Sequence, residues 1–223
     1  MPTLSCWSRS QVFTQPPGPV PLHDWTRWWR WQPGADWRHP QGPDSSIDDL
    51  QDHPVVHVGW EDAIAYARWA GKDLASEAEW EHAARGGLVG HEFAWGDELH
   101  PAGQLLANTW IGRFPFESVA PDGFQRTSPV GSYAANGYGL HDMIGNVWEW
   151  TSTPWTDSHR EVPAAPCCGG SLRIEESSRM VSKGGSHLCS PYYCQRYRPA
   201  ARQGHGVRDT TSHLGFRCVR RDA

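Results

Sequence analysis

One segment of the chain places apolar residues at the spacing of an amphipathic helix. Over residues 60–70, Ala63, Ile64 and Ala67 fall three or four positions apart, and Gly71 follows as a stop at the C-terminal end. The spacing therefore predicts a helix over residues 60–70. Immediately before it, the run Pro54–Val58 has the β-branched character of a short buried strand.

A second helix has a stronger start signal. Ser76 is followed three residues later by Glu79, which is a capping box: each side chain satisfies the free backbone N–H of the other residue. The pattern continues to about Arg85, and a Gly-Gly pair then ends it. Beyond that pair we predict no further helix and find no internal repeat.

The rest of the chain is divided into short segments by turn residues. Residues 1–50 are rich in proline and tryptophan, and we expect an extended arm with polyproline and turn segments that lies on the domain. Residues 156–180 have the composition of an exposed loop. We assign residues 1–24 as an N-terminal arm and residues 25–223 as the functional domain, an α+β fold with little regular secondary structure.

Composition supports a single loop-rich domain. The 223 residues include 14 tryptophans, 23 glycines and 18 prolines, a mixture that predicts ordered turns with indoles as packing anchors. The net charge of −5 gives no basic field for nucleic acid. No apolar run approaches the roughly 20 residues that cross a bilayer, and the start lacks the apolar core of a signal peptide. We expect a cytoplasmic monomer that contacts neither nucleic acid nor membrane.

Two cysteines stand five positions apart in an aromatic and basic segment. Cys189 and Cys194 are separated by four residues, and Arg196 and Arg198 follow. Spacing alone leaves several interpretations open: a local disulfide, unconnected thiols, or two soft ligands of the kind that suit Cu(I). Zinc is disfavoured because a closed tetrahedral site needs four ligands. The nearby arginines would favour the thiolate form.

Two loops carry oxygen ligands of the kind that calcium prefers. Asn108 and Asp122 lie at the two ends of one loop, and Asp142 and Glu149 flank a glycine turn. Calcium takes about six to eight oxygens from carboxylates, amides and carbonyls. Asp and Asn in loops are more often caps and turn formers, so the residues by themselves leave both interpretations open.

Six segments, in order and at matching spacing, are similar to a known enzyme family. They are GADWRHPQGPDSS, DHPVVHVGWEDAIAYARWAGK, SEAEWEHAARGG, NGYGLHDMIGNVWEWT, KGGSHLCSPYYCQRYR and SHLGFRC. Together they resemble the formylglycine-generating enzymes, or sulfatase-modifying factors. The motif GNVWEW marks the wider superfamily, whereas the cysteine pair marks its catalytic branch.

The resemblance implies a fold, a reaction and a partner. The fold would be a loop-rich variant of the C-type-lectin fold. The reaction would be the copper- and O2-dependent oxidation of a cysteine, within a Cys-x-Pro-x-Arg motif of a sulfatase, to Cα-formylglycine. The partner would be an unfolded or nascent sulfatase polypeptide.

The resemblance also implies the site residues. Cys189 and Cys194 would hold Cu(I), and the remaining pocket residues would be Ser186, Trp148, Tyr193 and His213, the last standing where the family has asparagine. Two structural calcium ions are implied. The first set of ligands would be Asn108, Thr109, Asp122 and Phe124, and the second Asp142, Gly145, Val147 and Glu149.

The chain departs from the family pattern at several positions. One family disulfide falls on Ala84 and Pro199, and in the other only Cys218 remains, opposite Ala67, so we expect Cys218 to be a free thiol. The usual opening stretch with a motif like I-P-G-G-x-F-x-M-G is missing, so residues 1–24 are interpreted as the remnant of a truncated start.

Two other functions stay open at this stage. One is a non-catalytic sulfatase-binding paralogue, a type that lacks the cysteine pair. The other is a non-haem iron oxidase of the same superfamily, which needs a histidine cluster that normally comes from a separate helical domain.

Overall fold

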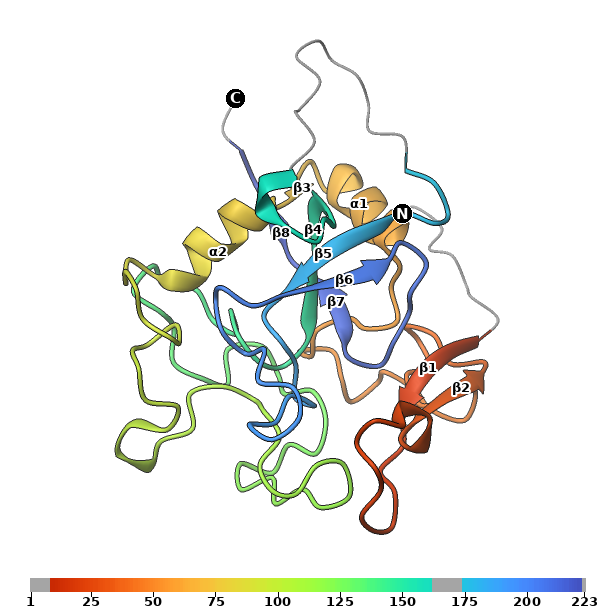
Figure 1. Cartoon of the computed structure of the whole chain (residues 1–223). Helices are drawn as coiled ribbons and strands as arrows, with labels where there is room; N and C mark the ends of the chain where they lie inside the picture. Colours follow the sequence, from red (N-terminus) through yellow and green to blue (C-terminus); the bar gives the residue numbers. More distant parts are fainter. Residues whose placement is uncertain (1–8, 162–173, 222–223) are drawn as a thin grey trace.

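A four-stranded sheet forms the centre of the molecule. In this computed structural model, which describes residues 9–161 and 174–221, the strand order is β6 (Arg202–Gly206), β5 (Arg179–Lys183), β4 (Trp148–Pro154) and β7 (Leu214–Phe216). Strands β4, β5 and β6 are antiparallel neighbours, whereas β7 runs parallel to β4. The described residues are therefore mixed α+β with short strands, as expected (Figure 1).

The two helices form where the sequence predicts them. Helix α1 (Trp60–Trp69) ends beside Gly71, whose φ of 67° suits glycine. Helix α2 (Glu77–Arg85) begins with the capping box: Ser76 Oγ accepts from the Glu79 N–H at 3.2 Å, and Glu79 Oε2 accepts from the Ser76 N–H at 2.7 Å. Within the described part of the chain, neither α-helix is long and apolar enough to span a membrane.

The strand predicted at Pro54–Val58 is wrong. His57 has a left-handed φ of 58°, which interrupts any strand there. The turn buries its imidazole, where Nδ1 pairs with Ser10 Oγ at 2.6 Å and Nε2 with the Pro40 carbonyl at 2.9 Å. Burial lowers the pKa of His57 to about 4, so the ring is neutral. Two specific hydrogen bonds to a buried ring thus override the local β-propensity.

Two-residue strands and a hairpin complete the architecture. Strand β3 (Asp73–Leu74) pairs with β8 (Cys218–Val219). In the proline- and tryptophan-rich N-terminal region, β1 (Arg9–Phe13) pairs in antiparallel register with β2 (Trp29–Pro33). This hairpin, which the sequence analysis did not anticipate, lies beside the main sheet (Figure 1).

The exposed loop predicted over residues 156–180 is only partly correct. Residues 162–173 lie outside the described residues. Glu175 and Glu176 are exposed, as predicted, but Met180 is fully buried in β5 and belongs to the core.

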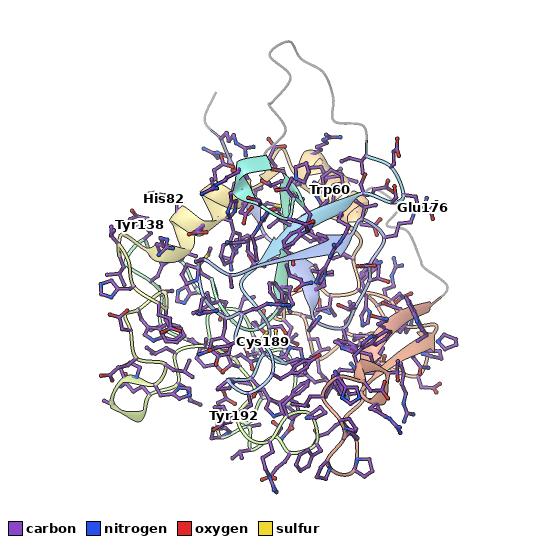
Figure 2. The ribbon with its side chains drawn as sticks, in the orientation of Figure 1. Trp60, His82, Tyr138, Glu176, Cys189 and Tyr192 are labelled. Atoms are coloured by element: carbon purple, nitrogen blue, oxygen red, sulfur yellow. The ribbon has the colours of Figure 1, made fainter. Side chains whose placement is uncertain are left out.

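Tryptophans anchor the core through their rings and their indole N–H groups. The main cluster contains residues of the helices and of the sheet, among them Trp80, Trp148 and Trp150. Trp60, labelled in Figure 2, packs against this cluster. Trp150 Nε1 donates to the Val58 carbonyl at 2.9 Å, and Trp60 Nε1 donates to the Thr151 carbonyl at 2.8 Å. Each indole therefore joins a loop or helix to β4, which agrees with the role expected for them.

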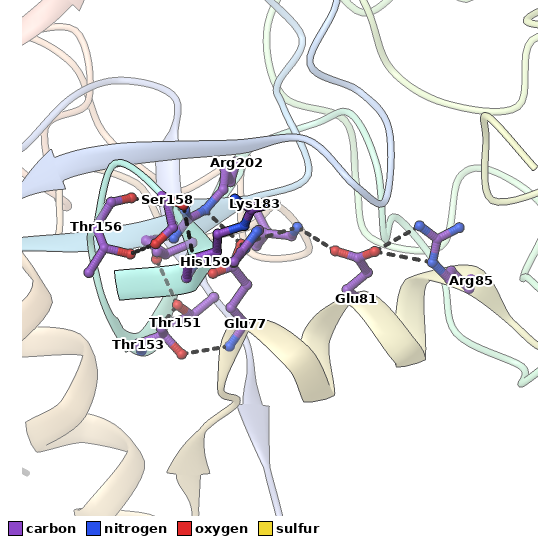
Figure 3. A network of polar contacts seen from close by, with 12 residues as sticks. Glu77, Glu81, Arg85, Thr151, Thr153, Thr156, Ser158, His159, Lys183 and Arg202 are labelled. Atoms are coloured by element: carbon purple, nitrogen blue, oxygen red, sulfur yellow. Dashed lines mark hydrogen bonds and ion pairs between the residues drawn. The ribbon is translucent and has the colours of Figure 1, made fainter. Parts of the chain in front are cut away.

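A buried lysine ends strand β5. Lys183 is 0 % exposed, and its Nζ lies 3.0 Å from Glu81 Oε2 and 3.7 Å from Glu77 Oε1 on α2. Arg202 of β6 also reaches Glu77 Oε1, at 2.8 Å. The cluster therefore ties α2 to two strands of the sheet (Figure 3).

We predict that Lys183→Met lowers the free energy of unfolding by about 3 kcal/mol, because removal of one partner leaves buried carboxylates short of positive charge. Lys72→Met is the matched control, since Lys72 is exposed, and it should change stability by less than about 0.5 kcal/mol. Urea unfolding followed by circular dichroism measures both. Equal effects of the two variants would contradict the structural role of Lys183.

Candidate active site

The segment after β5 turns back sharply beneath the sheet. Gly184 and Gly185 both have positive φ, 96° and 71°. A Cβ at Gly185 would lie 2.9 Å from the backbone nitrogen of Tyr197, so only glycine fits there without a shift. The turn places Ser186 and Cys189 in the interior, where Cys189 N donates to the Ser186 carbonyl at 2.9 Å.

The two cysteines meet inside this segment as free thiols. Their Sγ atoms are 3.1 Å apart, and Cys189 is 1 % exposed whereas Cys194 is partly exposed. Cys189 lies within the fold and Tyr192 at its edge (Figure 2). The pair is held by backbone hydrogen bonds from Trp110 N to the Cys189 carbonyl and from Cys194 N to the Ser190 carbonyl.

The two sulfurs differ in acidity. The hydrogen bond from the Cys189 thiol and the positive charge of Arg196 lower the pKa of Cys194 below its ordinary value, although burial opposes them. Burial and the same hydrogen bond raise the pKa of Cys189. In the metal-free protein Cys194 is therefore the sulfur that ionises first, with Cys189 as the donor to its thiolate.

A hollow of about 340 Å³ opens beside Cys194. Its wall consists of aromatic rings and a few polar groups: Trp29, Trp148, Tyr193, Arg196, Gln203, His205 and His213. A second hollow of about 340 Å³ shares Trp29, Tyr193, Gln203, His205 and His213 and extends to Trp25 and Asp209. Together the hollows form a space lined by aromatic rings that leads to Cys194 from the side of the β1–β2 hairpin.

Ser186 and His213 form a polar pair at this wall. Ser186 Oγ is 3.0 Å from His213 Nδ1, and it also accepts from the Leu188 N–H at 3.2 Å. The His213 ring packs edge-on against Trp29, with the ring centroids 4.8 Å apart. Burial lowers the pKa of His213 well below its ordinary value, so the imidazole is neutral.

The two aromatic residues predicted for the pocket also lie at this wall. Trp148 is buried, and its backbone N–H donates to the His213 carbonyl at 2.8 Å. Tyr193 stacks on Phe114 with the ring centroids 4.7 Å apart and an interplanar angle of 9°, and it meets Trp28 edge-on. The structure therefore brings together all six residues proposed for catalysis.

The first set of predicted calcium ligands lies within one stretch without helix or strand, residues 108–124. Asn108 Nδ2 donates to the Arg126 carbonyl at 2.8 Å, which leaves Oδ1 available as a ligand. Asp122 accepts from the Phe124 N–H at 3.2 Å and from the Tyr133 hydroxyl. In residues 9–161 and 174–221 we find no donor to the carbonyls of Thr109 and Phe124. The oxygens present fit a hard cation.

In the second set of predicted calcium ligands, one carboxylate is already paired with an arginine. Both oxygens of Glu149 accept from the Arg217 guanidinium, at 2.6 and 2.7 Å, and Oε2 also accepts from Trp80 Nε1 at 2.6 Å. Asp142 Oδ2 accepts from the Gly131 N–H at 2.7 Å. Calcium at this set would share Glu149 with Arg217, while Gly145 and Val147 would contribute main-chain oxygens.

Across the described residues no three His, Cys, Asp or Glu side chains gather in a metal-binding geometry. Calcium at either predicted set would therefore also need main-chain or amide oxygens, and the thiol site contains two sulfurs.

Part of the pocket wall was not predicted from the sequence. Trp29, Gln203 and His205 line both hollows, and they come from β2 and β6, outside the segment that holds the cysteines. No local pattern marks them, because strand β6 (RQGHG) has neither alternation nor β-propensity. The crowding of tryptophans around Trp29 is the one local signal that could have suggested a binding role.

Comparison with known proteins identifies the family. The chain matches the sulfatase-modifying factor enzyme 1-like domain over residues 10–222, so it belongs to this family. It is 54 % identical over 214 residues to a formylglycine-generating enzyme of Mycobacterium tuberculosis, covering 94 % of this chain and 71 % of that protein. It is 39 % identical over 193 residues to the mouse inactive C-alpha-formylglycine-generating enzyme 2, covering 86 % and 57 %.

Among solved structures, the fold is similar to that of PvdO from Pseudomonas aeruginosa. The TM-score is 0.57 at 30 % sequence identity, covering 74 % of this chain and 60 % of that one. The chain spans between 50 % and 71 % of the length of the first curated relatives that it matches.

We predict that Cys194 in the metal-free protein is alkylated at lower pH than an ordinary thiol, because its pKa is lowered. Arg196→Gln should move the alkylation profile to higher pH, since it removes a positive charge that favours the thiolate. Iodoacetamide labelling between about pH 6 and 10, with the Cys194 peptide quantified by mass spectrometry, measures the shift on either side of the ordinary thiol range. An unchanged profile in Arg196→Gln would contradict this electrostatic account, and Arg113→Gln, at an exposed arginine, is the control.

Proposed function

We propose that this protein oxidises a cysteine side chain of a sulfatase polypeptide to Cα-formylglycine, using copper and O2. The observation that carries the proposal is the pair of free thiols at 3.1 Å beneath an aromatic hollow. Membership of the sulfatase-modifying factor family supports it, as does the similarity to an enzyme named for formylglycine generation.

The donor set fits copper(I). Two sulfurs on one short segment, one of them favoured as a thiolate, are soft ligands that prefer Cu(I) to hard cations. Cys189 and Cys194 would hold the ion, and copper when bound would supply the activation of O2. The protein's own contribution is ligand placement, orientation of the peptide and exclusion of water from the sulfurs.

The hollow favours a peptide substrate. Its wall of rings suits an extended chain, and a Cys-x-Pro-x-Arg segment of an unfolded or nascent sulfatase would bring its cysteine to the wall beside Cys194. Tyr193 and Trp148 would pack against the peptide, while the contact with Ser186 Oγ orients the His213 ring. The substrate sulfur would then lie next to the two cysteine sulfurs of the protein.

The overall change is balanced in atoms and electrons. The substrate cysteine gives up two hydrogens to O2, one from Cβ and one from the thiol, which leaves a thioaldehyde. Water then replaces the sulfur, with release of hydrogen sulfide and formation of the aldehyde. If O2 leaves as hydrogen peroxide no further reductant is needed; if it leaves as water, an external thiol supplies two more reducing equivalents.

Two alternative functions make different predictions. A non-catalytic sulfatase-binding protein would bind the peptide without needing the thiols, whereas this chain retains both, placed together. An iron oxidase needs a cluster of protein ligands, and the described residues contain no such group of three. The copper oxidase is therefore the function we propose.

We predict that Cys189→Ser and Cys194→Ser each lose nearly all peptide oxidation, and that the double variant loses little more, because two sulfurs acting as one site give non-additive effects. A serine hydroxyl keeps the shape but is a hard, protonated donor. Cys218→Ser is the matched control and should keep activity. The assay is mass spectrometry of a Cys-x-Pro-x-Arg peptide after incubation with Cu(I)-loaded protein.

Copper binding is measured alongside, by competition with a Cu(I) chelator. Both single variants should remain folded and lose tight copper binding. Strong peptide oxidation by Cys189→Ser would place the chemistry elsewhere, and peptide binding without oxidation by wild-type protein would favour the non-catalytic alternative.

We also propose that calcium is structural here. If the two sets bind calcium, a chelator should lower the melting temperature, because a ligand that binds only the native state stabilises it by mass action. Asp122→Ala should lower the melting temperature of the calcium-loaded protein and shrink its response to chelator, whereas Asp157→Ala, outside both sets, should leave that response intact. A melting curve indifferent to chelator, with no calcium by metal analysis, would contradict the proposal.

A further inference from the structure

The wall shared by the two hollows contains an imidazole with no assigned role. His205 lies in β6, opposite Met180 of β5, and lines both hollows. Its ring centroid is 6.0 Å from that of Trp148 and 5.8 Å from that of Trp150. The ring is therefore held between two core tryptophans and borders the space beside Cys194.

One nitrogen of this ring is buried without a partner. His205 Nδ1 has no hydrogen bond among the described residues, and burial lowers the pKa of the ring to about 4, so it is neutral at physiological pH. A neutral imidazole has one N–H and one acceptor nitrogen. If Nδ1 carried the proton, its N–H would be a buried donor without an acceptor, which costs free energy. We therefore assign the proton to Nε2, the other nitrogen of a ring that lines both hollows.

Two other polar pairs of the wall already bond to each other. His213 Nδ1 pairs with Ser186 Oγ, and the Arg196 guanidinium donates to Gln203 Oε1. The remaining wall is mostly rings, which attract a peptide but give it little direction, because a ring face accepts many orientations. A single N–H at a fixed position would supply that direction.

We propose that His205 is a positioning residue for the substrate, whose Nε2–H donates a hydrogen bond to a main-chain carbonyl oxygen of the peptide in the hollow. This inference rests on the proposed function. A main-chain acceptor suits a site that must take different sequences around one cysteine. The bond would fix the peptide along β6 and so set the position of its cysteine beside Cys194.

The test uses a fluorescent Ser-x-Pro-x-Arg peptide, in which serine replaces the reacting cysteine, and metal-free protein. Fluorescence anisotropy gives the Kd. We expect His205→Phe, which keeps the ring shape without a donor, to weaken binding at least about tenfold, because the carbonyl loses its partner in a dry site. His205→Gln, whose Nε2–H stands near that of histidine, should stay within about threefold of wild type, since the donor is retained.

Two further measurements separate positioning from other roles. Cu(I) affinity should be unchanged in both variants; a loss in His205→Phe would make His205 part of the metal site and overturn the proposal. In steady-state assays of the loaded protein, His205→Phe should raise KM more than it lowers kcat, and His205→Gln should restore KM. His91→Phe, at an exposed histidine outside the hollow, is the control.

The outcomes distinguish this inference from the proposed function. If wild-type protein oxidises the Cys-x-Pro-x-Arg peptide and binds the Ser-x-Pro-x-Arg peptide, but His205→Phe binds the serine peptide equally well, the role of His205 is wrong and the function stands. If wild-type protein neither oxidises the cysteine peptide nor binds the serine peptide, both are wrong. If His205→Phe does not fold, His205→Met replaces it as a variant without a donor. We expect His205→Met to weaken peptide binding to the same extent, again in comparison with His205→Gln.

Discussion

The hydrogen bonds of one buried residue, Asn146, hold the loops of this protein together. Its backbone is left-handed, with φ of 57°, and its side-chain amide makes two bonds with the backbone of Ser128, at 2.9 and 3.1 Å. Its N–H donates to the Asn108 carbonyl at 2.8 Å. Its carbonyl accepts from both the N–H and Nδ1 of His187, at 2.9 and 2.8 Å. Three loops without a shared strand therefore meet at one residue, whose main-chain and side-chain nitrogen and oxygen atoms each make at least one hydrogen bond.

This junction connects the proposed calcium ligands to the thiol segment. Asn146 stands between Gly145 and Val147 of the second set, it bonds to Asn108 of the first, and His187 directly follows Ser186 of the pocket. Gly145 must be glycine because an added Cβ would lie 2.5 Å from the Asn108 carbonyl oxygen. Cations bound to these loops would stabilise the same backbone that positions the thiols. In a fold with few strand ladders, such shared backbone bonds take the place of sheet pairing.

The sequence predicts the elements that local interactions stabilise, and it does not predict those that depend on contacts between distant segments. Helix α2 could be predicted because its capping box is local: Ser76 and Glu79 satisfy each other whatever surrounds them. Strand β6 could not, because its sequence RQGHG forms a strand only through pairing with β5. Residues 54–58 have the β-propensity of a strand but form none, because the His57 ring bonds to two distant segments of the chain. The site residues came from motif resemblance, whereas His205 has no motif and is recognised only once the strands are placed. The C-type-lectin assignment stays a prediction.

The two cysteine thiols have different pKa values, and this difference affects how the pair would bind a metal ion. Cys194 borders the hollow and ionises first, whereas Cys189 lies behind it, fully buried and protonated because its pKa is raised. A soft cation arriving through the hollow would meet a thiolate, and ligation by both sulfurs would then displace the proton of Cys189. Metal affinity is coupled to proton release in this way wherever a ligand must be deprotonated. The burial that protects Cys189 from solvent therefore also keeps it protonated in the metal-free protein. This limits its oxidation there, because the thiolate is the reactive form.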